Sequence, residues 1–155
     1  MSNASSINIH QATIAEIEEI VPLFDAYRQF YNKPRDAEAC RAFLLERFKY
    51  NQSVIFLARD TSGNAVGFTQ LYPSFSSGAL GQIFILNDLF VMSSARRQGA
   101  GRMLLQAATR YAQATGAIRL TLLTEVTNEL AQKLYEAEGW NRDHTFYVYH
   151  FPLKS

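Results

Sequence analysis

The stretch Leu86–Ala108 reads LNDLFVMSSARRQGAGRMLLQAA, and it decides how we interpret the fold. Strand-forming residues run to Met92, a polar and basic loop follows, and two glycines separated by one residue precede a helical pattern. Backbone N–H groups at such a junction converge on an anion at the positive end of the helix dipole. The predicted cradle consists of Arg96, Arg97, Gln98, Gly99, Ala100, Gly101 and Arg102.

Two other interpretations of the loop compete with an anion cradle. The glycines could mark only a tight turn that requires positive φ, with the arginines as solvated surface. A nucleotide loop is excluded, because no Gly-Lys-Ser/Thr follows and Leu104 stands where the third glycine of a dinucleotide pattern belongs. The residues alone leave a turn or a pyrophosphate cradle of another kind.

Hydrophobic periodicity on both sides of this loop predicts an α/β domain. Thr13 and Glu16 form a capping-box pattern, and Asp36 follows the break NKPRD and can cap a second helix. Pro73 and the Ser/Gly-rich segment after it are expected to end a strand. The predicted order is β-α-α-β-β-β-α-β-α-β, a mixed sheet with helices on both faces. The strands are expected at 6–12, 53–60, 65–74, 82–92, 117–125 and 144–151, and the last helix at 128–138.

Composition limits the classes of function. The chain of 155 residues is expected to form one domain, and its net charge of +1 provides no field for nucleic acid or an anionic membrane. One cysteine and three scattered histidines predict no metal site. Apolar runs are too short to span a bilayer, so we expect a cytoplasmic protein. Residues 1–5 are predicted to be an expression-tag remnant or disordered.

Two motifs resemble those of a known family. RRQGAG at 96–101 resembles the Arg/Gln-x-x-Gly-x-Gly/Ala loop of the GNAT superfamily of acetyl-CoA-dependent N-acetyltransferases, with Arg96, Gly99 and Gly101 at the fixed positions. NELAQKLYEAEGW at 128–140 resembles the second signature of that family. Both motifs stand in the family's order, and the predicted elements fit the GNAT fold along essentially the whole chain.

The resemblance implies acetyl-CoA as cofactor and direct attack of an amine on the acetyl thioester. It implies that the pantetheine arm pairs with the backbone of Leu89, Phe90 and Val91, and that an N–H near Val91 polarises the thioester carbonyl. Asn128 would cap a helix and reach the coenzyme, and Tyr135 would be the general acid for the departing thiolate. The residues alone favour a core aromatic on its helix as the role of Tyr135, and the family motif reverses that preference.

LNDLFVM is most similar to the spermidine/spermine (thialysine) acetyltransferase branch, although Asn87 replaces the first member of that branch's acidic pair. Asp88 and Glu125 are candidates for accepting the amine proton through water, and the alternative for each isolated carboxylate is a surface or capping role. Tyr27 also fits the core stripe of its helix. The predicted acceptor residues are Tyr27, Tyr31, Tyr72, Asn87, Asp88 and Glu125.

We therefore predict an N-acetyltransferase that acetylates a primary amine of a small molecule, as a homodimer. One alternative is an enzyme that acetylates protein or peptide amines. Another is a GNAT-fold sensor that binds acyl-CoA without turnover.

Overall fold

The structure is a computed structural model of the chain, and it describes residues 6–154. The predicted tag remnant at residues 1–5 lies outside the described residues. The chain divides into two compact units, Met1–Leu123 and Thr124–Ser155.

The first unit contains a mixed sheet of five strands in the order β1-β2-β3-β4-β5. The pairs β1–β2, β2–β3 and β3–β4 are antiparallel, and the pair β4–β5 is parallel. A parallel pair needs a crossover, and α3 provides it. The strands are β1 (Asn8–Gln11), β2 (Val54–Arg59), β3 (Ala65–Ser76), β4 (Gly81–Val91) and β5 (Leu120–Thr121).

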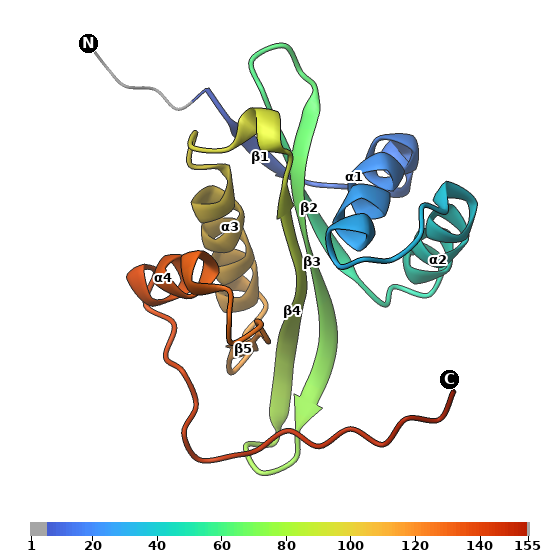
Figure 1. Cartoon of the computed structure of the whole chain (residues 1–155). Coiled ribbons are helices and arrows are strands. Elements are labelled where there is room, and N and C mark those ends of the chain that lie inside the picture. The colour runs from blue at the N-terminus through green and yellow to red at the C-terminus, as the bar shows by residue number, and fades with distance from the viewer. Residues whose placement is uncertain (1–5, 155) are drawn as a thin grey trace. The chain divides into compact units, whose positions relative to one another are not determined.

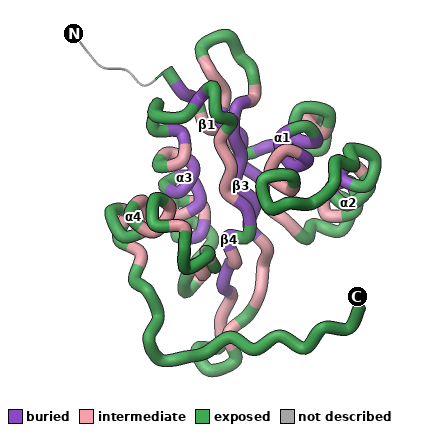
Figure 2. Tube along the Cα trace, viewed as in Figure 1, coloured by how far each residue is buried: buried purple, intermediate pink, exposed green. Residues whose placement is uncertain are grey.

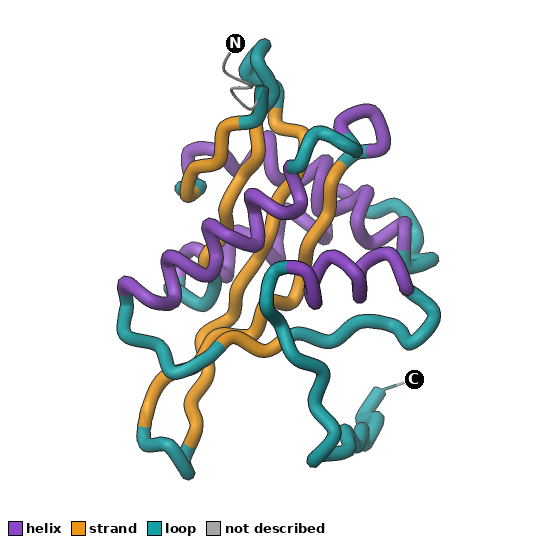
Figure 3. Tube along the Cα trace, turned by 90° about the vertical axis from the view of Figure 1, so that its left-hand side faces the viewer, coloured by secondary structure: helices purple, strands orange, loops and turns teal. Residues whose placement is uncertain are grey.

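Helices cover both faces of this sheet, as the sequence predicts (Figure 1). The short helix η1 (Ile14–Glu16) leads into α1 (Ile17–Phe30), which with α2 (Ala37–Lys49) lies on one face. On the other face, α3 (Ala100–Ala114) follows the short helix η2 (Ser93–Ala95) and crosses the strands (Figure 3). The second unit contains α4 (Glu129–Ala137).

Both predicted helix caps of the N-terminal half are confirmed. Thr13 Oγ1 accepts from the Ala15 N–H at 3.3 Å, and Glu16 Oε1 accepts from the Thr13 N–H at 3.0 Å. Asp36 Oδ1 accepts from the Ala39 N–H at 3.1 Å. Each carboxylate or hydroxyl satisfies a first-turn donor that has no partner inside its helix.

Buried residues lie along the strands and in α1 and α3 (Figure 2). On the α1/α2 face, Phe68 meets Phe24 edge-on, with ring centroids 6.2 Å apart. On the α3 face, Tyr111 meets Phe56 and Phe84 in the same manner. These contacts assign each strand position to a face, because successive side chains of a strand alternate.

The prediction that Pro73 ends its strand is wrong. β3 continues to Ser76, and Pro73 pairs with Phe84 of β4. On the other side, the pairing with β2 ends at Leu71, opposite Val54. Proline is tolerated there because its missing N–H is not needed for a ladder with β2.

The two C-terminal strand predictions need correction. Only Leu120–Thr121 of the predicted strand 117–125 are strand. The predicted strand at 144–151 is absent, since none of those residues is assigned to a strand. There, the side chain of Asp143 accepts from the N–H groups of Thr145 and Phe146 at 3.3 and 2.9 Å. Such local bonds divert amide donors that a ladder would use.

Candidate coenzyme and acceptor sites

A β-bulge divides β4. Gln70 pairs with Asp88 and Leu71 pairs with Leu86, so Asn87 is an extra residue opposite no partner on β3. The Asn87 carbonyl accepts from the Tyr27 hydroxyl at 3.2 Å. The bulge therefore lies next to α1 and sets the direction of the strand just before the predicted pantetheine residues.

The C-terminal part of β4 has a ladder with β3 but not with β5. β5 pairs with β4 at Phe84 and Ile85, and no pairing with β5 is found further along β4 among the residues described. Strand pairing thus leaves the β5 side of Leu89–Val91 available for another partner, as the resemblance implies. Arg96 Nε donates to the Val91 carbonyl at 3.3 Å, which ties the loop to the end of the strand.

The loop between β4 and α3 has backbone features that fit the predicted anion cradle. Arg97 and Gly99 both have positive φ, 69° and 81°, and Gly99 is the N-cap of α3 with no side-chain cap bond. The first N–H groups of the helix consequently have no side-chain acceptor from that cap. A Cβ placed on Gly99 would meet nothing within 4 Å, so the space at this residue is open. Exposed arginines at 96, 97 and 102 add positive charge nearby.

These features fit the pyrophosphate of coenzyme A. Ala100 is buried, as a residue that packs the first turn onto the sheet should be, while Gln98 is exposed. The predicted cradle residues are adjacent in the chain and form one loop with the helix N-terminus. The positive φ of Gly99 supports the tight-turn interpretation as well, because a turn and a cradle use the same backbone here.

The predicted acceptor residues of the first unit gather on the α1/α2 face. Asp88 is only 2% exposed, and its carboxylate accepts from Gln70 Nε2 at 2.5 Å and from Asn87 Nδ2 at 3.0 Å. Burial raises the pKa of Asp88, and the bonds from Gln70, Asn87 and Tyr27 partly offset that rise. A buried carboxyl of this kind is a candidate proton acceptor.

Tyrosines surround this carboxyl group. Burial and then the charge of Asp88 raise the pKa of both Tyr27 and Tyr72. The Tyr27 ring meets Tyr31 edge-on, with centroids 5.1 Å apart, and Tyr31 is 39% exposed. Tyr27 also contacts Phe24 and Phe68, so it belongs to the core as well as to the polar group.

The remaining predicted residues belong to the second unit. Asn128 caps α4, where its Oδ1 accepts from the Ala131 N–H at 3.2 Å. Tyr135 is half-buried and contacts Trp140, with ring centroids 6.2 Å apart. Glu125 is exposed, and its carbonyl accepts from the Asn128 N–H. The cap on α4 is confirmed, while the roles of these three side chains in catalysis stay predictions.

Sequence reasoning missed three residues with buried, unpaired polar side-chain atoms, namely Arg47, Ser53 and Gln70, of which Gln70 bonds Asp88. Gln70 is fully buried and faces α1 and α2, because it follows Phe68 by two positions. Its position in the apolar strand pattern GFTQL was a possible signal, since a buried amide usually needs a polar partner.

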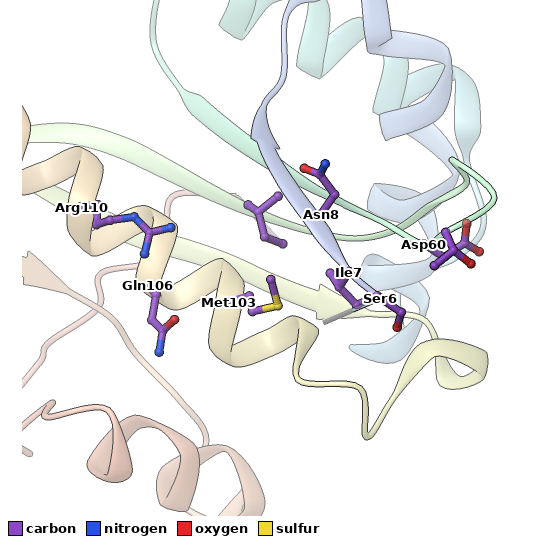
Figure 4. Close-up of a pocket in the computed structure, with 9 residues that line it drawn as sticks. Ser6, Ile7, Asn8, Asp60, Met103, Gln106 and Arg110 are labelled. Carbon is purple, nitrogen blue, oxygen red and sulfur yellow. The ribbon is translucent and has the colours of Figure 1, made fainter. Parts of the chain in front are cut away.

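A separate cavity of about 630 Å³ lies between β1, the start of the β2–β3 turn and α3 (Figure 4). Met103, Gln106 and Arg110 line it from the helix, and Asp60 and Thr61 line it from the turn. No predicted site residue lines this cavity, so the chemistry of the chain is not assigned to it.

Comparisons with known proteins identify the family. The profile described as "Acetyltransferase (GNAT) family" matches residues 20–140. An "Uncharacterized N-acetyltransferase YhfO" of Bacillus subtilis is 47% identical over 92% of this chain and 95% of its own length. A "Probable acetyltransferase" of Haemophilus influenzae is 36% identical over 80% of this chain and 83% of its own length.

A solved structure agrees with the sequence comparisons. The crystal structure of a probable acetyltransferase matches with a TM-score of 0.91 and 42% identity, and covers 96% of this chain and 99% of the other. GNAT acetyltransferases use acetyl-CoA, so acetyl-CoA is the cofactor of this chain. Among the described residues, no helix has both the length and the apolar character to cross a membrane. The chain belongs to the GNAT family of acetyltransferases.

Proposed function

We propose that the chain transfers the acetyl group of acetyl-CoA to a primary amine of a small molecule, by direct attack in a ternary complex. The observation that carries this proposal is the buried Asp88 carboxyl among tyrosines, directly after the bulged residue Asn87 in the strand that leads to the cradle loop. A buried carboxyl can hold an ammonium group and accept its proton.

The residues of the chain have separate tasks in this reaction. The coenzyme supplies an acetyl thioester, whose carbon forms a bond to the amine nitrogen as the carbon–sulfur bond breaks. Asp88 accepts the ammonium proton directly or through water, and its raised pKa brings it closer to neutral pH. The backbone N–H near Val91 polarises the carbonyl, as the family resemblance implies.

Tyr135 is proposed to donate a proton to the thiolate, and Asn128 to contact the coenzyme. Both assignments rest on the family motif at 128–140. We also propose a cytoplasmic homodimer, which the exposed aromatic side chains of the C-terminal segment support. Phe146, Tyr147, Tyr149 and Phe151 are each at least 80% exposed.

The proposed activity is tested by release of free thiol from acetyl-CoA across a panel of small primary amines. Turnover with at least one small amine is expected. Turnover only with peptides would favour a protein acetyltransferase, and coenzyme binding without turnover on any amine would favour a sensor.

The Tyr135→Phe variant tests the proton donor, because it removes the hydroxyl and keeps the ring against Trp140. Single-turnover acetyl transfer with saturating coenzyme and amine should slow about 10²–10⁴-fold, the usual contribution of a positioned acid. Transfer as fast as in the parent would remove Tyr135 from the chemistry.

A further inference from the structure

Three buried polar side-chain atoms have no hydrogen-bond partner within the described chain. They are Arg47 Nε, Ser53 Oγ and Gln70 Oε1. Buried polar atoms in native proteins are nearly always paired, so each unpaired atom calls for a ligand, a water or an ion. Two of the three atoms belong to donors and one is an acceptor, which suggests a ligand that carries both an anionic and a cationic group.

The strand register places two of these residues, Gln70 and Ser53, on one face of the sheet. Gln70 lies opposite Ile55 on β2 and Asp88 on β4, and directly opposite residues of adjacent strands share a face. Continuing the β2–β3 register by one pair past Val54 and Leu71 brings Ser53 opposite Tyr72. The face thus carries one polar pair at Gln70–Asp88 and a second at Ser53–Tyr72, about 7 Å further along the strands.

Arg47 lies on α2, one of the two helices that cover this face (Figure 1). Its guanidinium lies 4.5 Å from the centre of the Phe43 ring, and its side chain is 21% exposed. The charge of Asp88 raises the pKa of Tyr72 beyond the rise that burial causes, and the charge of Arg47 lowers it. The charges of Asp88 and Arg47 therefore act on the same hydroxyl with opposite effects on its pKa.

The ion pair with Glu46 leaves the Nε–H donor of Arg47 without a partner in the described chain. Arg47 Nη2 lies 2.9 Å from Glu46 Oε2, but the Glu46 side chain is 58% exposed, and exposed ion pairs contribute little. The guanidinium has five N–H donors in a planar fork that matches a carboxylate. Its Nε–H is buried and unpaired, so that edge of the fork is available.

We propose that this face binds an amino acid, with its ammonium group at Asp88 and Gln70 Oε1 and its carboxylate at Arg47 and Ser53 Oγ. The ammonium group offers the N–H donor that Gln70 Oε1 lacks, and the carboxylate accepts from the two unpaired donors. An α-amino acid with a hydrogen bond at each end spans the roughly 7 Å between the two polar pairs. The inference rests on the proposed function, since the amine held at Asp88 is the one that is acetylated.

The test compares amino acids with their own carboxamides, which keep the amine and lose the negative charge. Binding to the protein with coenzyme A present is measured by calorimetry for both enantiomers of the common amino acids, and acetyl transfer is measured separately. At least one acid should bind at least tenfold more tightly than its amide. Arg47→Gln should weaken that acid about 10–100-fold and leave the amide unchanged, as expected for a charge-assisted pair.

Arg41→Gln is the matched control, because Arg41 lies on the same helix and pairs with Glu18. It should leave the preference for the acid intact. If circular dichroism shows that Arg47→Gln does not fold, Arg47→Lys keeps the positive charge and should retain a reduced preference.

Each outcome decides between the two proposals. Equal affinity for acid and amide, binding of neither, or an equal effect of Arg47→Gln on both would overturn the amino-acid site, even if other amines are acetylated. Preferential binding of an acid that Arg47→Gln removes, without acetyl transfer to any amine, would support the site and overturn the proposed activity.

Discussion

The two faces of the sheet in the first unit differ in what they bury. On the α3 face, β2 and β4 present Phe56 and Phe84 to Tyr111, and the hydroxyl of Thr69 is satisfied by the Asp88 carbonyl at 2.8 Å. On the α1/α2 face, β4 and β3 bury a carboxyl group and an amide with an unpaired oxygen, Asp88 and Gln70. The α3 face is filled by packed side chains with satisfied polar atoms, while the α1/α2 face retains a buried polar atom without a partner in the described chain.

The largest expected effect lies on the polar face. Asp88→Asn keeps the shape of the side chain and removes the proton acceptor, so kcat/KM should fall about 10²–10⁴-fold. A raised pKa in the folded state means that ionised Asp88 lowers stability as the pH rises through that pKa. The variant should therefore be at least as stable as the parent at pH 7. Thermal unfolding and steady-state kinetics on the same preparation check both halves, and an unchanged rate would make Asp88 structural.

The packing face should respond in the opposite way. Phe56→Ala removes a ring that is 8% exposed and contacts Tyr111, and buried Phe→Ala changes cost about 3–5 kcal/mol. The free energy of unfolding in urea should fall by that amount, while kcat below the melting temperature stays near the parental value. A selective loss of kcat in a folded Phe56→Ala protein would show that the α3 face also contributes to turnover.

At low pH, we expect the first loss of stability to come from the hydrogen-bonded network around Glu16 and not from either face of the sheet. Glu16 lies 2.5 Å from His10 Nε2 and 2.8 Å from Arg59, beside β1. Burial raises the pKa of Glu16, but bonds from His10, the Thr13 N–H and Arg59 outweigh it and lower the pKa from 4.5 to about 2. A lowered pKa gives stability that is present above pH 4.5 and lost as the pH falls towards 2.

The loss should reach on the order of 3 kcal/mol, at 1.36 kcal/mol for each unit of pKa. Urea unfolding between pH 7 and 2.5 measures it, with Glu16→Gln as the variant that lacks this contribution. If parent and variant lose stability in parallel, the network around Glu16 does not cause acid sensitivity.

The smallest expected effect concerns one hydrogen bond between β3 and β4, from the Thr69 hydroxyl to the Asp88 carbonyl. Thr69→Val removes the hydroxyl bond to the Asp88 carbonyl, which should cost about 1–3 kcal/mol because the carbonyl is buried. Turnover should change less than threefold, although Thr69 is adjacent to Gln70 in the chain. A rate loss close to that of Asp88→Asn would show that both faces control the chemistry.

The sequence predicts most elements of the fold because the helix caps and the hydrophobic periods are local signals. Thr13, Asp36 and Asn128 cap the helices that follow them, as their spacing indicates. The closing strand could not be predicted in the same way, because a strand depends on a partner elsewhere in the chain. Alternation in HTFYVYHF shows only that the segment could pair.

The site is predictable where a motif fixes the backbone and not where the fold brings side chains together. Gly99 adopts the positive φ that its motif requires. Arg47 and Gln70 belong to different elements, and no local pattern relates them to Asp88. The position of Gln70 beside Asp88 follows from the register of β3 and β4, which is a long-range property.

The bulge at Asn87 shifts the alternation of side chains along β4 by one residue. Leu86 and Asp88 are two positions apart and would share a face in a regular strand, yet their partners Leu71 and Gln70 lie on opposite faces. One inserted residue thus lets β4 direct Phe84 and Leu86 to the α3 face and Asp88 and Phe90 to the α1/α2 face. Deleting Asn87 would move every side chain on one side of it to the opposite face of the sheet. We therefore expect insertions and deletions at this position to be poorly tolerated.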